Sequence, residues 1–338
     1  MIFLFSSDDG QVHSRSRYLR GGLLRNFHRI RVVRNFSEVP SGDMWLHGLS
    51  RDPTAPLDGT LCRAMAAFKG KIAFYQNDDG CEFFINRIPV DLRDRAVLFL
   101  RNHWPADENL ISLEIRTRTG FINPLLKPLA AKAGPALRDR PIDICFYGSF
   151  TGNQDRGRDH ALKLLKQAGI PYTGGLIEYV NVPQPPADCA VPAISSREHG
   201  RLLSMSKICL ALHGNCALTY RFFEGMSRRC LVLAQELASI RFAGCGLKPG
   251  VHYVSVKDDL SDLVEKARHF LDHIDEAQKI ADAGFEHFSK NFAFSGVNLP
   301  QPLFEEIVSS WKNFPLQRGQ VTVKGLATRW FLPVIHSL

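Results

Sequence analysis

The residues best suited to chemistry are Arg221 and Glu224, three positions apart on a short amphipathic stretch, Tyr220–Ser227. An apolar run, Ile208–Leu212, and a loop that contains Gly214 precede this stretch. A buried strand that leads through such a loop into a helix leaves backbone N–H groups unpaired at the helix start, where the helix dipole also attracts an anion. Arg221, in the first turn, would add a fixed positive charge and a fork of donors for phosphate oxygens.

Glu224 falls on the same helix face as Arg221. A carboxylate repels phosphate, but it can accept hydrogen bonds from two sugar hydroxyls. Phosphate at the helix end and a diol one turn along is the layout of a nucleotide-diphosphate ligand. The alternative from spacing alone is an exposed ion pair between the two residues, worth roughly a few tenths of a kcal/mol, with Gly214 an ordinary turn glycine.

Short apolar runs alternate with amphipathic stretches along the chain. This alternation favours a largely parallel sheet with helices on both faces. The expected strands are Ile2–Phe5, Met44–Leu46, Lys71–Tyr75, Ala96–Phe99, Ile142–Tyr147, Ile208–Leu212, Cys230–Ala234 and His252–Val256. A stretch rich in proline and glycine, Ile122–Pro141, divides them into two halves. Because ligands of open α/β sheets bind beyond the carboxyl ends of strands, the loops there are the expected sites.

The composition is that of a globular protein. Of the 338 residues, 45% are hydrophobic and 22% charged, which excludes bulk disorder, collagen and a coiled-coil rod. The net charge of +8 suits an anionic partner, and no nucleic-acid motif stands out. The eight cysteines lack zinc-site spacing, and no apolar run approaches the roughly 18 residues of a membrane-spanning helix. We expect a cytoplasmic protein and leave peripheral contact with the inner face of the membrane open.

The segment from Ser206 to Leu233 resembles the donor-site segment of glycosyltransferases with the GT-B fold. It is most similar to the exostosin-type enzymes, the Cap10-like protein O-glucosyltransferases and the spore-maturation-type bacterial enzymes. The matching residues are Ser206-Lys207, Gly214, Tyr220-Arg221, Phe223-Glu224 and Cys230. A second block matches at His252-Tyr253, Asp259–Leu263 and Asp275-Glu276-Ala277.

Two residues depart from the pattern of these families. Arg229 stands where the families have the glycine that ends the helix, and Val232 replaces a proline in the following strand. Both positions belong to the helix-to-strand turn rather than to the phosphate site. We therefore expect the fold to be kept.

The resemblance implies an α/β fold with two Rossmann-like domains facing a cleft, the GT-B fold. We expect an N-terminal acceptor domain over residues 1–125, a linker over 126–141 and a C-terminal nucleotide-sugar donor domain over 142–300. A C-terminal segment, 301–338, would pack back across both domains, as it does in GT-B proteins.

The resemblance also implies roles for single residues. Arg221 would neutralise the donor diphosphate, and Glu224 would hold the ribose. The complete donor-binding set that we expect is Gly148, Ser149, Arg158, His213, Gly214, Asn215, Thr219, Tyr220, Arg221, Phe223 and Glu224. For Arg158 the alternative is a solvated residue at a helix start, and for His213 it is a loop histidine whose hydrogen bonds are satisfied within the protein.

Sugar transfer also needs a general base near the acceptor hydroxyl. In GT-B enzymes the base usually comes from the first domain, and Asp9 is our first choice because its loop follows the first strand. Asp8, His13 and Asp79 are alternatives, and ordinary turn formation by Asp-Gly is a further one. No acidic pair is placed for a metal, so we expect no metal and no cofactor, with a UDP- or GDP-linked sugar as substrate.

The sequence thus predicts a glycosyltransferase that moves a sugar from a nucleotide-diphosphate donor to a hydroxyl of a glycan or glycolipid, such as a cell-surface polysaccharide or a lipopolysaccharide core. A non-catalytic nucleotide-sugar or glycan-binding protein on the same fold is the alternative. A dinucleotide-dependent enzyme, such as a nucleotide-sugar epimerase, is disfavoured because no GxGxxG follows an early strand.

Overall fold

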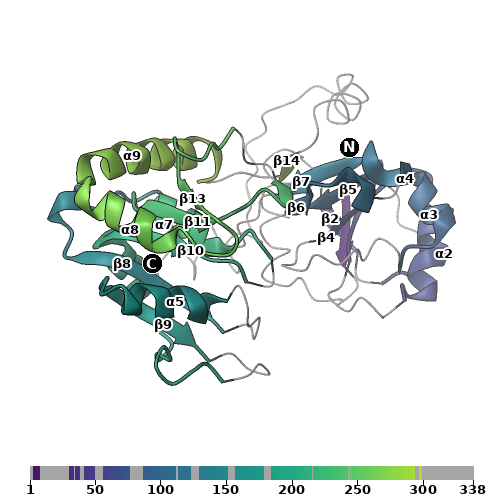
Figure 1. Cartoon of the computed structure of the whole chain (residues 1–338). Helices are drawn as coiled ribbons and strands as arrows, with labels where there is room; N and C mark the ends of the chain where they lie inside the picture. The colour runs from purple at the N-terminus through teal and green to yellow at the C-terminus, as the bar shows by residue number, and fades with distance from the viewer. Residues whose placement is uncertain are drawn as a thin grey trace.

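The computed structural model describes residues 3–7, 30–33, 35–38, 42–49, 56–76, 87–111, 113–122, 129–150, 157–178, 184–214, 216–242, 244, 246–293 and 297–298. These residues form two halves, each built on a mainly parallel sheet with helices packed against it (Figure 1). The predicted C-terminal segment, 301–338, lies outside the described residues.

The N-terminal sheet has seven strands in the order β14-β7-β5-β4-β3-β1-β2. All its pairs are parallel except β14 with β7. The strands are β1 (Phe3–Ser7), β2 (Ile30–Val32), β3 (Met44–Gly48), β4 (Lys71–Gln76), β5 (Ala96–Arg101), β7 (Thr119–Ile122) and β14 (Val297–Asn298). The helices of this half within the described residues are α2 (Gly59–Ala67), α3 (Val90–Arg95) and α4 (Leu113–Arg116), with a 3-10 turn, η2 (Glu108–Leu110).

The C-terminal sheet has five parallel strands in the order β13-β11-β10-β8-β9. The strands are β8 (Ile142–Ser149), β9 (Tyr172–Ile177), β10 (Ser206–Ala211), β11 (Leu231–Gln235) and β13 (Val254–Val256). The helices are α5 (Arg158–Gln167), α6 (Ser196–Ser204), α7 (Tyr220–Ser227), α8 (Leu263–Asp272) and α9 (Ile274–Asn291), after a 3-10 turn, η3 (Leu137–Asp139).

The C-terminal strands are apolar on both faces because helices cover both faces. On one face Ile208 and Leu210 of β10 join a core with residues of α5 and α8. On the other, Cys145 and Cys209 pack with Leu203 of α6. The near-continuous apolar runs that predicted these strands are therefore explained by two-sided burial.

Two features join the halves. The strand β6 (His103–Pro105) of the N-terminal half pairs antiparallel with β12 (Ile240–Phe242) of the C-terminal half. After α9 the chain returns to the N-terminal sheet, where β14 pairs with β7. The predicted C-terminal domain included residues 297–298, whereas their strand belongs to the N-terminal sheet. None of the helices in the described part is long and apolar enough to cross a bilayer.

Candidate functional site

The candidate site lies at the carboxyl ends of β8 and β10, where α7 begins. Helix α7 packs very closely on β10: a Cβ added at Gly225 would lie 2.8 Å from Cys209 Cβ. Only glycine allows this approach. The close packing fixes the first turn of α7, with Arg221, at the edge of the sheet.

The start of α7 has no side-chain cap. Thr219 is the N-cap residue in an extended conformation, and its side chain makes no capping hydrogen bond. Its Oγ1 is buried without a hydrogen-bond partner among the described residues. A cap of this kind would have satisfied N–H groups of the first turn. The helix start therefore keeps donors that its own N-cap side chain does not use.

Arg221 and Glu224 form an ion pair through Nη1 and Oε2. Arg221 Nε also donates to the carbonyl oxygen of Tyr147, near the end of β8. The two side chains are only 23% and 24% exposed, so the pair exists but is not the exposed surface pair that spacing alone allowed. Oε1 of Glu224 makes no hydrogen bond within the described residues, which leaves one carboxylate oxygen for hydroxyl donors.

His199 of α6 lies behind this pair and was missed by sequence reasoning. Its Nδ1 is 3.7 Å from Glu224 Oε2, and its ring packs edge-on against Tyr147 with centroids 5.9 Å apart. The residue is 7% exposed, and its Nε2 has no partner in the described structure. Burial, with the charge of Arg221, lowers the pKa of His199 to about 4, so it is neutral at pH 7. A histidine on the buried face of an amphipathic helix was the available signal.

Arg158 joins the ends of two strands. It donates from Nη1 to Ser149 O at 2.6 Å and from Nε to His213 O at 2.8 Å. A Cβ at Gly214 would lie 2.5 Å from Arg158 Nη2, and one at Gly148 would lie 3.3 Å from Nη1. Arg158 does begin α5, as the alternative has it, but its guanidinium is partly buried and bonded to two carbonyl oxygens rather than fully solvated. The guanidinium fills the space that both glycines leave.

His213 is held by the loops after β11 and β13. Its backbone N–H donates to Gln235 Oε1 at 2.9 Å, and its Nε2 lies 2.8 Å from Glu236 O. Its Nδ1 lies 3.3 Å from Asp258 Oδ1, and burial lowers its pKa. Both ring nitrogens thus face protein partners, as expected for the alternative of a satisfied loop histidine.

The remaining predicted donor residues do not all reach the site. Phe223 is fully buried and packs against Phe222 and Phe292, with ring centroids 5.2 and 4.8 Å apart. It belongs to the apolar core because it lies on the face of α7 away from Arg221. Tyr220, the first residue of α7, is partly buried. Asn215 lies outside the described residues.

All four candidates for the general base, Asp8, Asp9, His13 and Asp79, also lie outside the described residues. The strand ends that precede them carry buried polar groups. Ser6 Oγ lies 2.7 Å from His47 Nδ1 and accepts a hydrogen bond from Trp45 Nε1, also at 2.7 Å. No group of three or more His, Cys, Asp and Glu side chains suited to a metal ion occurs in the part of the chain that is described.

At the C-terminal end of α7, the structure shows how Arg229 can occupy the position at which the resembling families have a glycine. The N–H groups of Arg229 and Cys230 donate to Met226 O and Gly225 O, both at 3.0 Å, which is the Schellman arrangement. Arg229 takes φ of 60°, the left-handed conformation that favours glycine. Its Nε donates to Asp282 of α9, which holds the pKa of that carboxyl below its usual value. The arginine adopts the glycine conformation and gains an ion pair, and the turn is kept.

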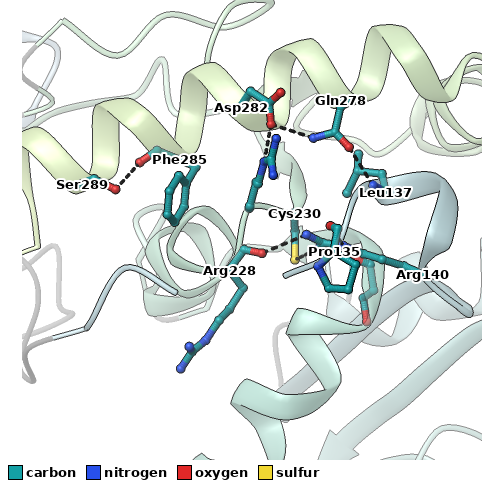
Figure 2. Close-up of polar contacts among 11 residues, drawn as sticks. Pro135, Leu137, Arg140, Arg228, Cys230, Gln278, Asp282, Phe285 and Ser289 are labelled. Carbon is teal, nitrogen blue, oxygen red and sulfur yellow. Dashed lines mark hydrogen bonds and ion pairs between the residues drawn. The ribbon is translucent and has the colours of Figure 1, made fainter. Parts of the chain in front are cut away.

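Arg140 closes the same end of the helix from the linker side (Figure 2). The residue is 2% exposed. It donates to Pro135 O at 3.0 Å, Ser206 O at 2.7 Å and Arg228 O at 3.1 Å, and its Nη1 lies 3.5 Å from Cys230 Sγ. Burial raises the pKa of Cys230 to about 12, so Arg140 faces a neutral thiol. The linker is thereby anchored to the C-terminal end of α7.

This chain is similar to known proteins in both sequence and fold. Residues 158–295 match the model of a family described as glycosyl transferase-like. Among solved structures, Anabaena HepE in complex with UDP has a TM-score of 0.58 at 11% identity over 93% of this chain and 100% of that chain. A glycosyltransferase from Rickettsia africae gives 0.52 at 12% identity, over 92% and 98%. An α-glucosyltransferase in complex with UDP and DNA gives 0.52 at 11%, over 91% and 98%.

The fold shared with these structures is the GT-B fold, as predicted. The family match covers α5 to α9 and so includes Arg158, the loop after β10 and the Arg221–Glu224 pair. The shared fold and the family match over residues 158–295 are both those of glycosyltransferases of the GT-B type.

Proposed function

We propose that this enzyme transfers a sugar from a nucleotide-diphosphate donor, UDP- or GDP-linked, to a hydroxyl of a glycan. The observation that carries the proposal is the Arg221–Glu224 pair, partly buried at the start of α7 on the carboxyl edge of the sheet. The HepE and α-glucosyltransferase structures are complexes with UDP, which supports a nucleotide of this kind.

In this proposal the two side chains have different ligands. Arg221 and the helix start stabilise the negative charge of the diphosphate, which grows as the sugar departs. Glu224 accepts hydrogen bonds from the ribose hydroxyls. Arg221 fixes the carboxylate through Oε2, so that Oε1 is held in place before the ribose arrives. Such preorganisation lowers the entropy cost of binding.

The acceptor side of the proposal rests on the resemblance. We propose a cell-surface polysaccharide or lipopolysaccharide core as acceptor, a cytoplasmic enzyme that works at the inner face of the membrane, and Asp9 as general base with Asp8, His13 and Asp79 as alternatives. The charge of the leaving diphosphate is held by Arg221 and the helix start, without a metal.

A panel of UDP-, GDP-, ADP- and CMP-sugars, read by thermal shift and calorimetry, tests the donor site. One nucleotide class should raise Tm, because a ligand that binds only the folded state stabilises it. Arg221→Ala should weaken its binding by about tenfold or more, the range for loss of a charge-assisted hydrogen bond.

Arg201→Ala is the matched control. Arg201 also forms an i,i+3 pair, with Glu198 on α6, but its side chain is 55% exposed and the pair has no place at the strand ends. This variant should bind like the wild type. Failure of every nucleotide to bind the wild type, or unchanged binding by Arg221→Ala, would contradict the proposal. Binding with no sugar transfer in the presence of cell-envelope extract would instead indicate a binding protein.

A further inference from the structure

A buried contact between a thiol and an imidazole connects the two halves of the molecule beside the candidate site. Cys216 Sγ lies 3.1 Å from Nε2 and 3.6 Å from Nδ1 of His103. His103 is 2% exposed and belongs to β6, whereas Cys216 is 5% exposed and lies in the loop between β10 and α7. The contact therefore joins the N-terminal half to the loop between β10 and α7, which we call the donor loop and of which residues 213, 214 and 216–219 are described.

The backbone around His103 is held from both halves of the molecule. In the ribbon of β6 and β12 it pairs with Phe242, and Ala106 N donates to Ser239 O at 2.9 Å beyond the ribbon. Trp104 Nε1 donates to Gly120 O at 2.8 Å, which ties β6 to β7. A side chain whose backbone is fixed in this way can serve as a reference point for a neighbouring loop.

Cys216 transmits this position to the start of α7. Its Sγ accepts the N–H of Leu218 at 3.4 Å, and its carbonyl oxygen accepts the N–H of Gly214 at 3.0 Å. The next residue after Leu218 is Thr219, the N-cap of α7. A change in the position of the thiol would thus shift both sides of the donor loop and the first turn of the helix.

We propose that His103 is a positioning residue for the nucleotide donor: held in the two-stranded ribbon that joins the halves, its imidazole sets the donor loop and the start of α7 through Cys216. The inference rests on the proposed function, because the loop matters only if a nucleotide binds there. It assigns part of donor affinity to a residue of the half that the resemblance gives to the acceptor.

The variants needed are His103→Ala, His103→Gln, Cys216→Ala and the double variant His103→Ala/Cys216→Ala. Alanine at 103 removes the imidazole, whereas glutamine restores a polar group that can reach the thiol. Cys189→Ala is the matched control, because Cys189 is also 5% exposed in the same half, where its Sγ lies 3.5 Å from Pro186 O.

The first readout is UDP affinity by calorimetry. His103→Ala and Cys216→Ala should each raise Kd by about tenfold, and the double variant should be no weaker than either, because residues that act through one contact are non-additive. His103→Gln should recover most of the affinity, and Cys189→Ala should bind like the wild type. A variant whose melting temperature is close to that of the wild type is one in which only the donor loop has changed.

The second readout needs no nucleotide: the rate at which iodoacetamide alkylates Cys216, followed by peptide mass spectrometry. Release of the loop should raise this rate by about tenfold or more in His103→Ala, since alkylation of a buried group follows local opening. The rates at Cys189 and Cys209 should not change.

The two readouts separate the inference from the function. A wild type that binds no UDP or other nucleotide of the panel defeats the proposed function, and the alkylation rates still report whether His103 holds the loop. Unchanged Cys216 alkylation in His103→Ala, or additive losses of affinity in the double variant, would overturn the positioning role.

Discussion

The two ends of α7 are built in opposite ways. At the C-terminal end, Arg140, the Schellman hydrogen bonds and the Arg229–Asp282 pair all engage the last turn or the turn that follows it (Figure 2). At the N-terminal end, the N-cap side chain makes no hydrogen bond, and Oγ1 of Thr219 is buried without a partner among the described residues.

In the proposed function, this difference leaves the N-terminal end of a short helix of eight residues available to the nucleotide. Unpaired polar groups destabilise a protein, and the contacts at the far end offset this cost while fixing the helix axis. We therefore expect substitutions at the C-terminal end to change stability, and substitutions at the N-terminal end to change nucleotide binding.

The largest effect on stability is expected for Arg140→Ala, which would remove the contacts of this arginine at the C-terminal end of α7. Three carbonyl oxygens would lose a buried donor, so the free energy of unfolding should fall by about 3–5 kcal/mol. Urea denaturation measures the loss. Arg138→Ala removes a neighbouring arginine whose side chain is 60% exposed and should change stability by less than about 0.5 kcal/mol. Equal effects of the two variants would refute the anchoring role of Arg140.

The next effect depends on pH and concerns His199, which lies behind the Arg221–Glu224 pair. His199 has a pKa of about 4 in the folded protein, below the ordinary value of 6.5. Between pH 6.5 and 4 the histidine is protonated in the unfolded chain but stays neutral in the folded protein. The free energy of unfolding should therefore fall as the pH drops, by up to about 3 kcal/mol near pH 4.

His199→Leu should remove this contribution, so its stability should depend less steeply on pH between 6.5 and 4 than that of the wild type. His160→Leu, at an exposed position of α5, serves as the control and should keep the wild-type slope. Denaturation curves at pH 7 and 4.5 provide the measurement, and parallel curves for wild type and His199→Leu would show that His199 is not buried neutral.

A smaller effect tests the turn at position 229. Arg229→Ala keeps a Cβ in the left-handed conformation and loses the pair with Asp282, so it should destabilise the protein by about 1 kcal/mol. Arg229→Gly loses the same pair but relieves the backbone, and its stability should lie within about 0.5 kcal/mol of the wild type. Thermal unfolding decides; a glycine variant less stable than the alanine variant would contradict this account.

The smallest stability effect is expected for Glu224→Gln. The amide oxygen can still accept a hydrogen bond from Arg221, and the pair is partly exposed, so stability should change by less than about 1 kcal/mol. Nucleotide affinity should nevertheless fall measurably in calorimetry. A large loss of stability with unchanged affinity would assign Glu224 to the fold rather than to the donor site.

Much of the C-terminal half could be predicted from the sequence. Its strands and α7 could be predicted because apolar runs and glycine-containing loops are local features of the sequence. The strands β8 and β11 extend further than predicted, to Ser149 and Gln235, because polar residues at strand ends still take part in the backbone pairing. The ribbon of β6 and β12 and the two-residue β14 could not be predicted, since such short strands exist only through partners more than a hundred residues away.

The same distinction applies to the site. Helical spacing predicted that Arg221 and Glu224 share a face. The contacts with Tyr147 and His199 come from β8 and α6, and no local pattern encodes them. Phe223 was included because the resemblance pairs it with Glu224, but helical geometry turns it into the core.

The return of the chain to its first sheet has a consequence for attempts to express the halves separately. A fragment that ends in the linker would leave β7 without the strand that covers its outer edge, and unpaired edge strands invite aggregation. A fragment that begins in the linker would likewise expose β12. Successful dissection of this enzyme should therefore graft residues 297–298 and their flanks onto the first half.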